Sequence, residues 1–254
     1  MNPALLYPIG CSESCRYASA ALEEAGYTLT DHPSPEITHL LLDVPSFQNN
    51  SLLRDGSDLK EMLRMLPKTI TVIGGNLDVD FLDGYHTLDL LKDPFYLAKN
   101  AAITAECALK VAVPYLKTTF EMSPVLILGW GRIGKCLARL LSALHCPVTV
   151  AARKESDRAM LEGLGYRAVD FSNVPEICMN FRILFNTVPN PPICCDAVDL
   201  HRNGIVIDLA SAPGIQGRTV IPARGLPGKD APESSGKLIC RTILGLCAQR
   251  EGKL

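Results

Sequence analysis

The sequence predicts an α/β protein made of two Rossmann-like, doubly wound parallel-sheet domains with a cleft between them. Short apolar runs alternate with helical patterns along most of the 254 residues, which is typical of parallel sheets built from βαβ units. One of these runs leads directly into a GxGxxG motif at 129–134. The length suits two modest domains. We expect a substrate or partner domain at 1–118, joined by a C-terminal helix at 232–254, and a dinucleotide-binding domain at 119–231.

The first domain is predicted from three apolar runs at 4–9, 39–44 and 69–75, which have the length of buried strands. Between them, capped helical patterns span Ser12–Ala25 and Ser57–Leu66. The glycines of this half form no phosphate-binding fingerprint. We therefore expect this domain to hold a substrate or a partner protein rather than a second dinucleotide.

A connecting helix is predicted over 93–117, ending near a kink at Pro114. The second domain then begins with the strand Val125–Leu128, followed by a helix over Arg132–Leu144 and a strand over Pro147–Ala151. The C-terminal helix, which begins at Pro232, is expected to cross back onto the first domain.

Composition excludes several classes of function. The chain is 47% hydrophobic and 20% charged with a net charge of -2, so it can bury a sizeable core but offers no basic surface for nucleic acid. No apolar stretch reaches the ~18 residues of a membrane span, and the start lacks signal-peptide features, so we expect a cytoplasmic protein. The ten cysteines lack the paired spacing of zinc sites, and we expect reduced thiols and no metal.

The glycine motif assigns a separate task to each of its glycines. Gly129 permits the tight turn, Gly131 lets the backbone approach a pyrophosphate, and Gly134 lets the helix pack close to the strand. The amides of Arg132 and Ile133 lie at the start of the helix, where the helix dipole favours phosphate. The strand before and the helix after the motif favour dinucleotide binding over a merely glycine-rich turn.

The end of the next strand indicates which dinucleotide is bound. NAD-binding domains place a carboxylate there for the adenosine ribose, whereas this chain has Arg153 and Lys154. A guanidinium can bind a 2'-phosphate in a forked geometry. We therefore expect NADP rather than NAD, the alternative being that both are solvated surface cations.

Two further strands should also contribute to the cofactor site. The run RILFNTVP ends in Thr187, Val188 and Pro189, and GIVIDLASAPG continues into Leu209 and Ala210. Ligands in such folds bind outside the carboxyl ends of strands, so these residues should line the ribose and nicotinamide. Simple strand termination is the alternative explanation.

Several ordered motifs from about Lys99 onward resemble those of a known family, the A subunit of dipicolinate synthase. Its members are dehydrogenase-like, NADP-binding proteins of spore formers. The GLPGK segment and the DLAS segment with its PG carry more specificity than the glycine loop. The motifs are NAAITAECAL at 100–109, LGWGRIG at 128–134, AAR at 151–153, FNTVP at 185–189, IDLASAPG at 207–214 and RGLPGKDAPESSG at 224–236.

The resemblance implies oxidation of a dihydrodipicolinate-type precursor to pyridine-2,6-dicarboxylate in spore formation, by hydride transfer to the nicotinamide. It also implies that the B subunit of dipicolinate synthase is a partner, and we expect a homo-oligomer. The residues that the resemblance makes candidates for catalysis and for contact with the substrate carboxylates are Asn100, Thr104, Ser211 and Lys229.

Two alternatives stay open, because residues 1–90 depart from the family pattern. One is a dehydrogenase that acts on another small carboxylate. The other is a cofactor-binding regulatory subunit without turnover. The glycine motif does not separate them, because all three proteins would bind the same cofactor.

Overall fold

The structure is a computed structural model that describes residues 4–49, 51–189, 204–210, 214–215 and 220–251. The chain divides into two compact units. The first consists of residues 1–100 and 227–254, and the second of residues 101–226. Each unit has its own parallel sheet, so the predicted α/β architecture with two sheets is confirmed.

The sheet of the first unit has five parallel strands in the order β2-β1-β3-β4-β5. Three of them confirm the predicted strands with shorter bounds. The two short edge strands were not predicted, because each has exposed residues and neither forms an apolar run. The strands are β1 (Leu5–Pro8), β2 (Thr28–Leu29), β3 (His39–Leu41), β4 (Thr71–Gly74) and β5 (His86–Asp89).

Helix α1 (Glu13–Glu24) begins where the sequence predicts, because the Oγ of Ser12 accepts a hydrogen bond from the Cys15 amide at 3.2 Å. The helix predicted over 57–66 is shorter. It forms one α-helical turn, α2 (Leu59–Met62), and continues as a 3-10 turn, η1 (Leu63–Met65), before Pro67. Two further 3-10 turns are η2 (Asp80–Leu82) and η3 (Leu90–Lys92).

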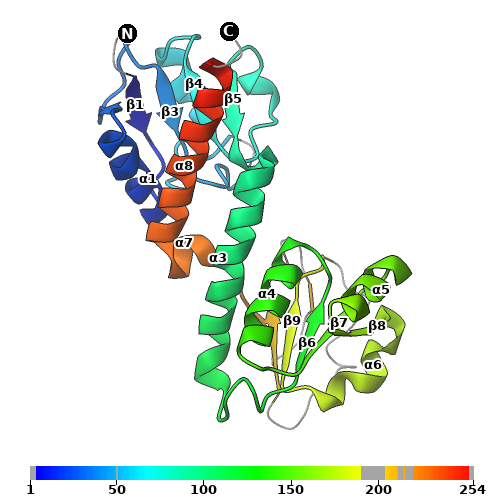
Figure 1. Cartoon of the computed structure of the whole chain (residues 1–254). Coiled ribbons are helices and arrows are strands. Elements are labelled where there is room, and N and C mark those ends of the chain that lie inside the picture. Colours follow the sequence, from blue (N-terminus) through cyan, green and yellow to red (C-terminus); the bar gives the residue numbers. More distant parts are fainter. Residues whose placement is uncertain (1–3, 50, 190–203, 211–213, 216–219, 252–254) are drawn as a thin grey trace. The chain divides into compact units, whose positions relative to one another are not determined.

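The first unit is completed by the C-terminal part of the chain. The short helix α7 (Leu226–Asp230) leads into α8 (Pro232–Glu251), which packs along α1 (Figure 1). A side chain at Gly236 would overlap the Cβ of Tyr17 and the backbone of α1. The absence of a side chain at this position therefore allows the two helices to approach closely.

Helix α3 (Pro94–Ala112) begins in the first unit and ends in the second. It is shorter than the predicted 93–117, because the chain tightens into the 3-10 turn η4 (Val113–Tyr115), which contains Pro114. Proline removes a backbone donor and disfavours continuation of an α-helix. Pro114 therefore accounts for the end of α3 at Ala112.

The sheet of the second unit has six parallel strands in the order β11-β10-β9-β6-β7-β8. The chain runs outward from β6 to β8, returns to β9 on the other side of β6, and runs outward again. The point where the direction reverses therefore lies between β6 and β9. The strands are β6 (Val125–Leu128), β7 (Val148–Ala151), β8 (Arg167–Val169), β9 (Ile183–Asn186), β10 (Ile205–Asp208) and β11 (Val220–Pro222).

Helices α4 (Arg132–Ala143), α5 (Glu155–Gly163) and α6 (Val174–Ile177) lie between the described strands of this sheet along the chain. Helix α4 contacts β6 and β7, and α5 contacts β8 (Figure 1). Helix α6 lies between the 3-10 turns η5 (Phe171–Asn173) and η6 (Cys178–Asn180). Every residue of β6 and β9 is buried, which is expected for central strands of a covered parallel sheet.

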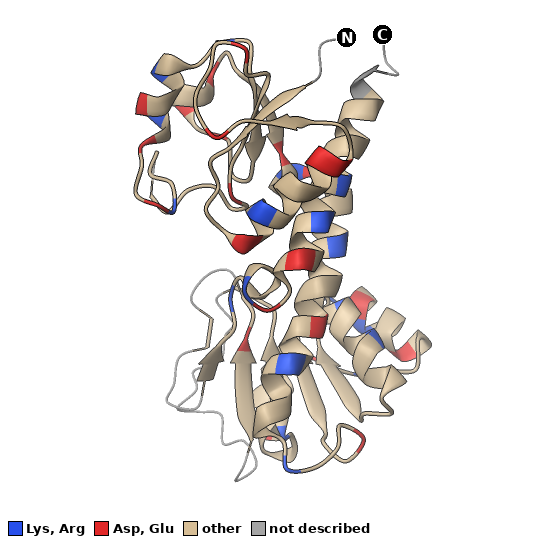
Figure 2. Ribbon diagram, turned by 90° about the vertical axis from the view of Figure 1, so that its left-hand side faces the viewer, with Lys and Arg blue, Asp and Glu red and all other residues tan. Residues whose placement is uncertain are grey.

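Lys and Arg are interspersed with Asp and Glu on the ribbons of both units (Figure 2). This distribution agrees with the small net charge and differs from the clustered basic face of a nucleic-acid-binding protein. Among the described residues, no helix combines the length and apolar character that crossing a membrane requires.

Candidate functional site

The glycine motif lies at the carboxyl end of β6, at the reversal point of the second sheet. Gly129 follows β6 directly, and its amide donates to the carbonyl of Ala151 at 2.9 Å, which continues the ladder to β7. Residues 187–188 follow β9 on the other side. Because ligands of open α/β sheets bind at this kind of reversal point, this edge is the candidate cofactor site.

Gly129 has a backbone φ of 104°, in the region that L side chains rarely adopt. A Cβ atom at this position would lie only 2.6 Å from the Oγ1 of Thr187 and 2.6 Å from the Cγ2 of Val188. The Thr187 hydroxyl donates to the carbonyl of Leu128 at 2.7 Å. The turn after β6 and the turn after β9 therefore fit together only with glycine at position 129.

Gly134 lies in the first turn of α4, and a side chain there would overlap the carbonyl oxygen of Gly129. Gly131 differs, because no heavy atom lies within 4 Å of the position that its Cβ would take. The space in front of Gly131 is therefore open, whereas the space at Gly129 and Gly134 is filled by the protein itself. Gly129 and Gly134 are thus needed for close packing, whereas the approach of a pyrophosphate to Gly131 stays a prediction.

The start of α4 fits a diphosphate. Gly131 is its N-cap residue and provides no side-chain cap for the amides of the first turn, which include those of Arg132 and Ile133. Arg132 is exposed and Ile133 is half-buried. The residues present therefore suit the pyrophosphate of a dinucleotide, which bare amides and the helix dipole stabilise.

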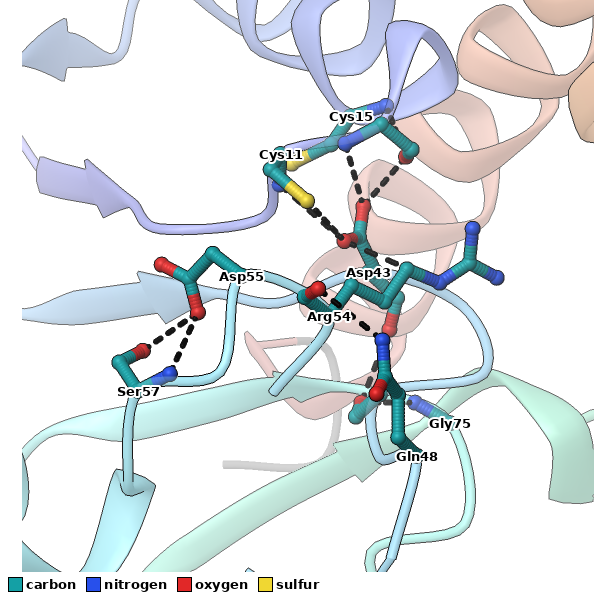
Figure 3. Close-up of polar contacts among 10 residues, drawn as sticks. Cys11, Cys15, Asp43, Gln48, Arg54, Asp55, Ser57 and Gly75 are labelled. Carbon is teal, nitrogen blue, oxygen red and sulfur yellow. Dashed lines mark hydrogen bonds and ion pairs between the residues drawn. The ribbon is translucent and has the colours of Figure 1, made fainter. Parts of the chain in front are cut away.

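The first unit presents a different chemistry at the corresponding helix start (Figure 3). There the buried carboxylate of Asp43 accepts hydrogen bonds from the amides of Cys11 and Ser12, both at 3.1 Å. The Ser12 hydroxyl also donates to this carboxylate. A carboxylate of the protein itself therefore lies against the turn that leads into α1, and the Ser12 hydroxyl accepts from the Cys15 amide of the first helical turn. The negative charge of Asp43 disfavours a phosphate beside this turn.

Arg153 and Lys154 follow β7, next to the glycine loop, and both are exposed. The guanidinium of Arg153 lies 5.6 Å from the ring centre of Phe171. Lys154 is the N-cap residue of α5 and makes no side-chain cap bond. Two cations on a loop beside the glycine motif are suited to a phosphate on the adenosine ribose.

Arg158 was not predicted and has a clear structural role behind this loop. Its Nη1 donates to the carbonyls of Ala152 and Arg153, both at 2.8 Å, and to the carboxylate of Asp170 at 2.6 Å. Asp170 directly follows β8 and also accepts from the amide of Ser172. Arg158 therefore holds the loop that carries the predicted cations through its backbone carbonyls, and Asp170 holds Arg158 in place. No signal in the local sequence identifies Arg158, because two of its partners are backbone carbonyls and the third, Asp170, lies 12 residues away.

The ends of β9 and β10 are joined by a buried polar pair. Asn186 donates to the carboxylate of Asp208 at 2.7 Å and to the carbonyl of Val188 at 3.1 Å, and it accepts from the Val188 amide at 3.1 Å. The side chain of Arg224 lies 3.5 Å from the same carboxylate. Leu209 and Ala210 continue from β10 and are buried. These contacts fix the loops predicted to line the ribose and nicotinamide.

The remaining predicted residues are distributed over several elements. Val188 is half-buried and Pro189 is exposed after β9. Asn100 and Thr104 lie four residues apart on α3, Thr104 buried and Asn100 half-buried, and Lys229 is exposed on α7. Asn100 and Lys229 belong to the first unit and Thr104 to the second. Ser211 lies outside the described residues.

A metal site needs several ligating side chains in one place, and a reactive thiol at Cys11 or Cys15 needs a low pKa. No group of three or more His, Cys, Asp or Glu side chains there is placed to hold a metal ion. Burial, together with the charge of Asp43, raises the pKa of the Cys11 thiol, and it raises that of Cys15 to about 12. Both therefore carry a protonated thiol at neutral pH, which is a poor nucleophile.

No family model matches the chain. A sequence match was found with the A subunit of dipicolinate synthase from Bacillus subtilis (strain 168), with 29% identity over 166 residues, which is 61% of this chain. The match spans 56% of that relative, little more than half of its length.

The fold is similar over nearly the whole chain to the crystal structure of the dipicolinate synthase A subunit from Bacillus halodurans. The TM-score is 0.83 at 20% identity, with 96% of this chain and 97% of that chain covered. An L-alanine dehydrogenase has a similar fold, with a TM-score of 0.68 at 10% identity, covering 96% of this chain and 80% of that one. The chain is therefore similar to the A subunit of dipicolinate synthase, by sequence over the matched residues and by fold over nearly its whole length.

Proposed function

We propose that the chain is an NADP-dependent oxidoreductase of the dipicolinate synthase A type. It would oxidise a dihydrodipicolinate-type precursor to pyridine-2,6-dicarboxylate in spore formation. The observation that carries the proposal is the open space in front of Gly131 at the uncapped start of α4, beside the filled spaces at Gly129 and Gly134. The sequence similarity to a dipicolinate synthase supports this choice of substrate.

In this proposal, the ends of four neighbouring strands of the second sheet, β10, β9, β6 and β7, have a part in holding the cofactor. The amides at the start of α4 bind the pyrophosphate, and Arg153 with Lys154 binds the adenosine 2'-phosphate. Thr187, Val188 and Pro189, with Leu209 and Ala210, line the nicotinamide ribose. When bound, NADP supplies the ring that accepts a hydride from the substrate.

Carboxylate binding is assigned to Asn100, Thr104, Ser211 and Lys229. An amide, two hydroxyls and an ammonium are groups that donate hydrogen bonds to carboxylates, and they would orient the substrate ring toward the nicotinamide. The Bacillus subtilis relative is by its name one of the subunits of a synthase, which supports a B subunit for this chain too. Residues 1–118 with 232–254 are proposed as the domain that receives the substrate or this partner.

Turnover tests the proposal directly. The full chain is mixed with dihydrodipicolinate and NADP, with and without a dipicolinate synthase B subunit. Formation of NADPH is followed by absorbance, and we expect it to form together with pyridine-2,6-dicarboxylate. Binding of NADP without turnover in either mixture would contradict the proposal and favour a regulatory subunit. Turnover of a different small carboxylate alone would favour the other dehydrogenase.

Arg153→Asp tests the cofactor assignment. The change replaces a cation with an anion that repels a 2'-phosphate, so we expect NADP affinity to fall by roughly 10-fold to 100-fold. NAD affinity should change much less, because NAD has no phosphate at this position. Calorimetric titration of both dinucleotides measures the difference.

The matched control is Arg139→Asp, which makes the same change of charge at an exposed position of α4. It should leave the ratio of the two affinities unchanged. Equal losses of NADP and NAD affinity in Arg153→Asp would show that the 2'-phosphate assignment is wrong.

A further inference from the structure

The first unit has a reversal point of its own, between β1 and β3. From β1 the chain runs to β2 on one side, and it then places β3, β4 and β5 on the other. The residues that follow β1 and β3 therefore meet at the edge of the sheet where α/β folds bind ligands. Gly10, Cys11 and Ser12 follow β1, and Asp43 follows β3. Figure 3 shows the polar contacts at this point.

Asp43 is almost completely enclosed, with 3% of its side chain exposed. One carboxylate oxygen accepts from the amide and hydroxyl of Ser12, and the other accepts from the Cys11 amide. The Cys11 thiol lies 3.6 Å from the second oxygen. A Cβ at Gly10 would lie 2.8 Å from the Asp43 amide, so the two turns are in close contact. The carboxylate is therefore fixed in position.

Arg54 is the cation that faces this buried carboxylate. Its Nε lies 4.0 Å from the Oδ2 of Asp43, while 42% of its side chain stays exposed. In Figure 3 the two terminal nitrogens of the guanidinium extend away from Asp43. Among the described residues these nitrogens have no acceptor. Arg54 therefore presents a pair of donors outward from the sheet edge.

The backbone that carries Arg54 is also held in place. Gln48 donates from its side-chain amide to the carbonyl of Arg54 at 3.0 Å, and the amide of Leu53 donates to the carbonyl of Ser57 at 2.9 Å. The Asp55 carboxylate accepts from the amide and the hydroxyl of Ser57 at 2.9 and 2.6 Å. A guanidinium on a loop that is fixed in this way loses little conformational freedom when an anion binds.

We propose that Arg54 binds one carboxylate of the substrate and that Asp43 is its positioning residue. The inference rests on the proposed function, which supplies a dicarboxylate as substrate. A guanidinium donates two parallel hydrogen bonds to a carboxylate, and a second anion on its other edge orients it. Asp43 takes up the amides of Cys11 and Ser12 in the turn before α1, so Arg54 is the group of this edge that we propose binds the anion.

Arg54 contributes little to folding, because its own side chain is 42% exposed and the ion pair is long at 4.0 Å. The buried Asp43 carboxylate keeps its hydrogen bonds from Cys11 and Ser12 when Arg54 is replaced. Arg54→Met should therefore fold like the wild type. The test is calorimetric titration of the full chain, saturated with NADP, with pyridine-2,6-dicarboxylate in buffer free of divalent metals. We expect Arg54→Met to weaken binding roughly 10-fold to 100-fold. Arg54→Lys keeps the positive charge but cannot donate two parallel hydrogen bonds, so we expect an intermediate loss of dicarboxylate affinity.

The matched control is Arg64→Met, which removes another exposed arginine of the first unit, paired with Glu61 at 2.8 Å. It should bind the dicarboxylate like the wild type. Asp43→Asn removes the charge of the side chain and replaces one acceptor oxygen with an NH2 donor, so it should weaken dicarboxylate binding and leave NADP affinity unchanged. Its melting temperature is compared with that of the wild type, because the amides of Cys11 and Ser12 both donate to this side chain. If Arg54→Met does not fold, Arg54→Lys and Arg54→Gln give the same comparison.

Equal dicarboxylate affinity in the wild type and the Arg54 variants would overturn the inference, and so would the absence of dicarboxylate binding by the wild type. Both results leave the dinucleotide site unaffected. A wild type that binds no dinucleotide would instead contradict the proposed function. NADP affinity is therefore measured for every variant, so that the two failures are distinguished.

Discussion

Gly131→Val is expected to abolish dinucleotide binding while leaving the protein folded. The Cβ of residue 131 meets no atom of the protein within 4 Å, and the backbone φ of -81° is accessible to any residue. The new side chain would instead fill the space that a pyrophosphate needs. We expect affinity for both NADP and NAD to fall by at least roughly 100-fold, measured by calorimetry, with an unchanged melting temperature.

The control for this variant is Gly163→Val, at the end of α5, where a side chain also meets open space. It should bind NADP with wild-type affinity. Wild-type affinity in Gly131→Val would contradict the assignment of the pyrophosphate to this turn, because any bound diphosphate would then lie elsewhere.

Gly134→Val is expected to have the opposite outcome, a loss of stability. A side chain at 134 overlaps the carbonyl oxygen of Gly129, which is backbone and cannot rotate away. Helix α4 would have to move off β6, and such overpacking costs about 3 kcal/mol. We expect the melting temperature of the unfolding transition to fall by roughly 10 °C, followed by circular dichroism.

Gly163→Val serves again as the control and should melt like the wild type, because it adds the same side chain without a clash. A wild-type melting temperature in Gly134→Val would show that α4 does not depend on close contact with the turn after β6. The pair of variants thus separates a glycine needed for a ligand from a glycine needed for packing.

The central strands and the long helices are predictable from the sequence because their signals are local. β6 is a continuous apolar run that leads into glycine, and α1 has both a serine cap and an apolar face. The two-residue strand β2 has no such signal, because its pairing with β1 alone makes it a strand. The same holds for β11, which is paired with β10 and has an exposed last residue.

The candidate site divides in the same way. The glycine loop can be recognised in the sequence because its glycines stand at fixed spacing, directly between an apolar strand and a helix. Arg158 and Asp43 are not visible there, because their roles depend on segments 12 and about 30 residues away that the fold brings to them. Asp43 stands out in the sequence only as an acidic residue at a strand end, and its contacts with the start of α1 require the parallel pairing of β1 with β3.

The division of the first unit between the two ends of the chain has a consequence for how the protein is made. Residues 101–226 form a continuous unit, so the ribosome can release everything that the second sheet needs before the last segment is translated. Helix α8, which packs on α1, is synthesised only after the second unit. Until then the side chains of α1 that α8 covers lack that partner. Residues 1–100 are therefore synthesised first but can complete their packing only after α8.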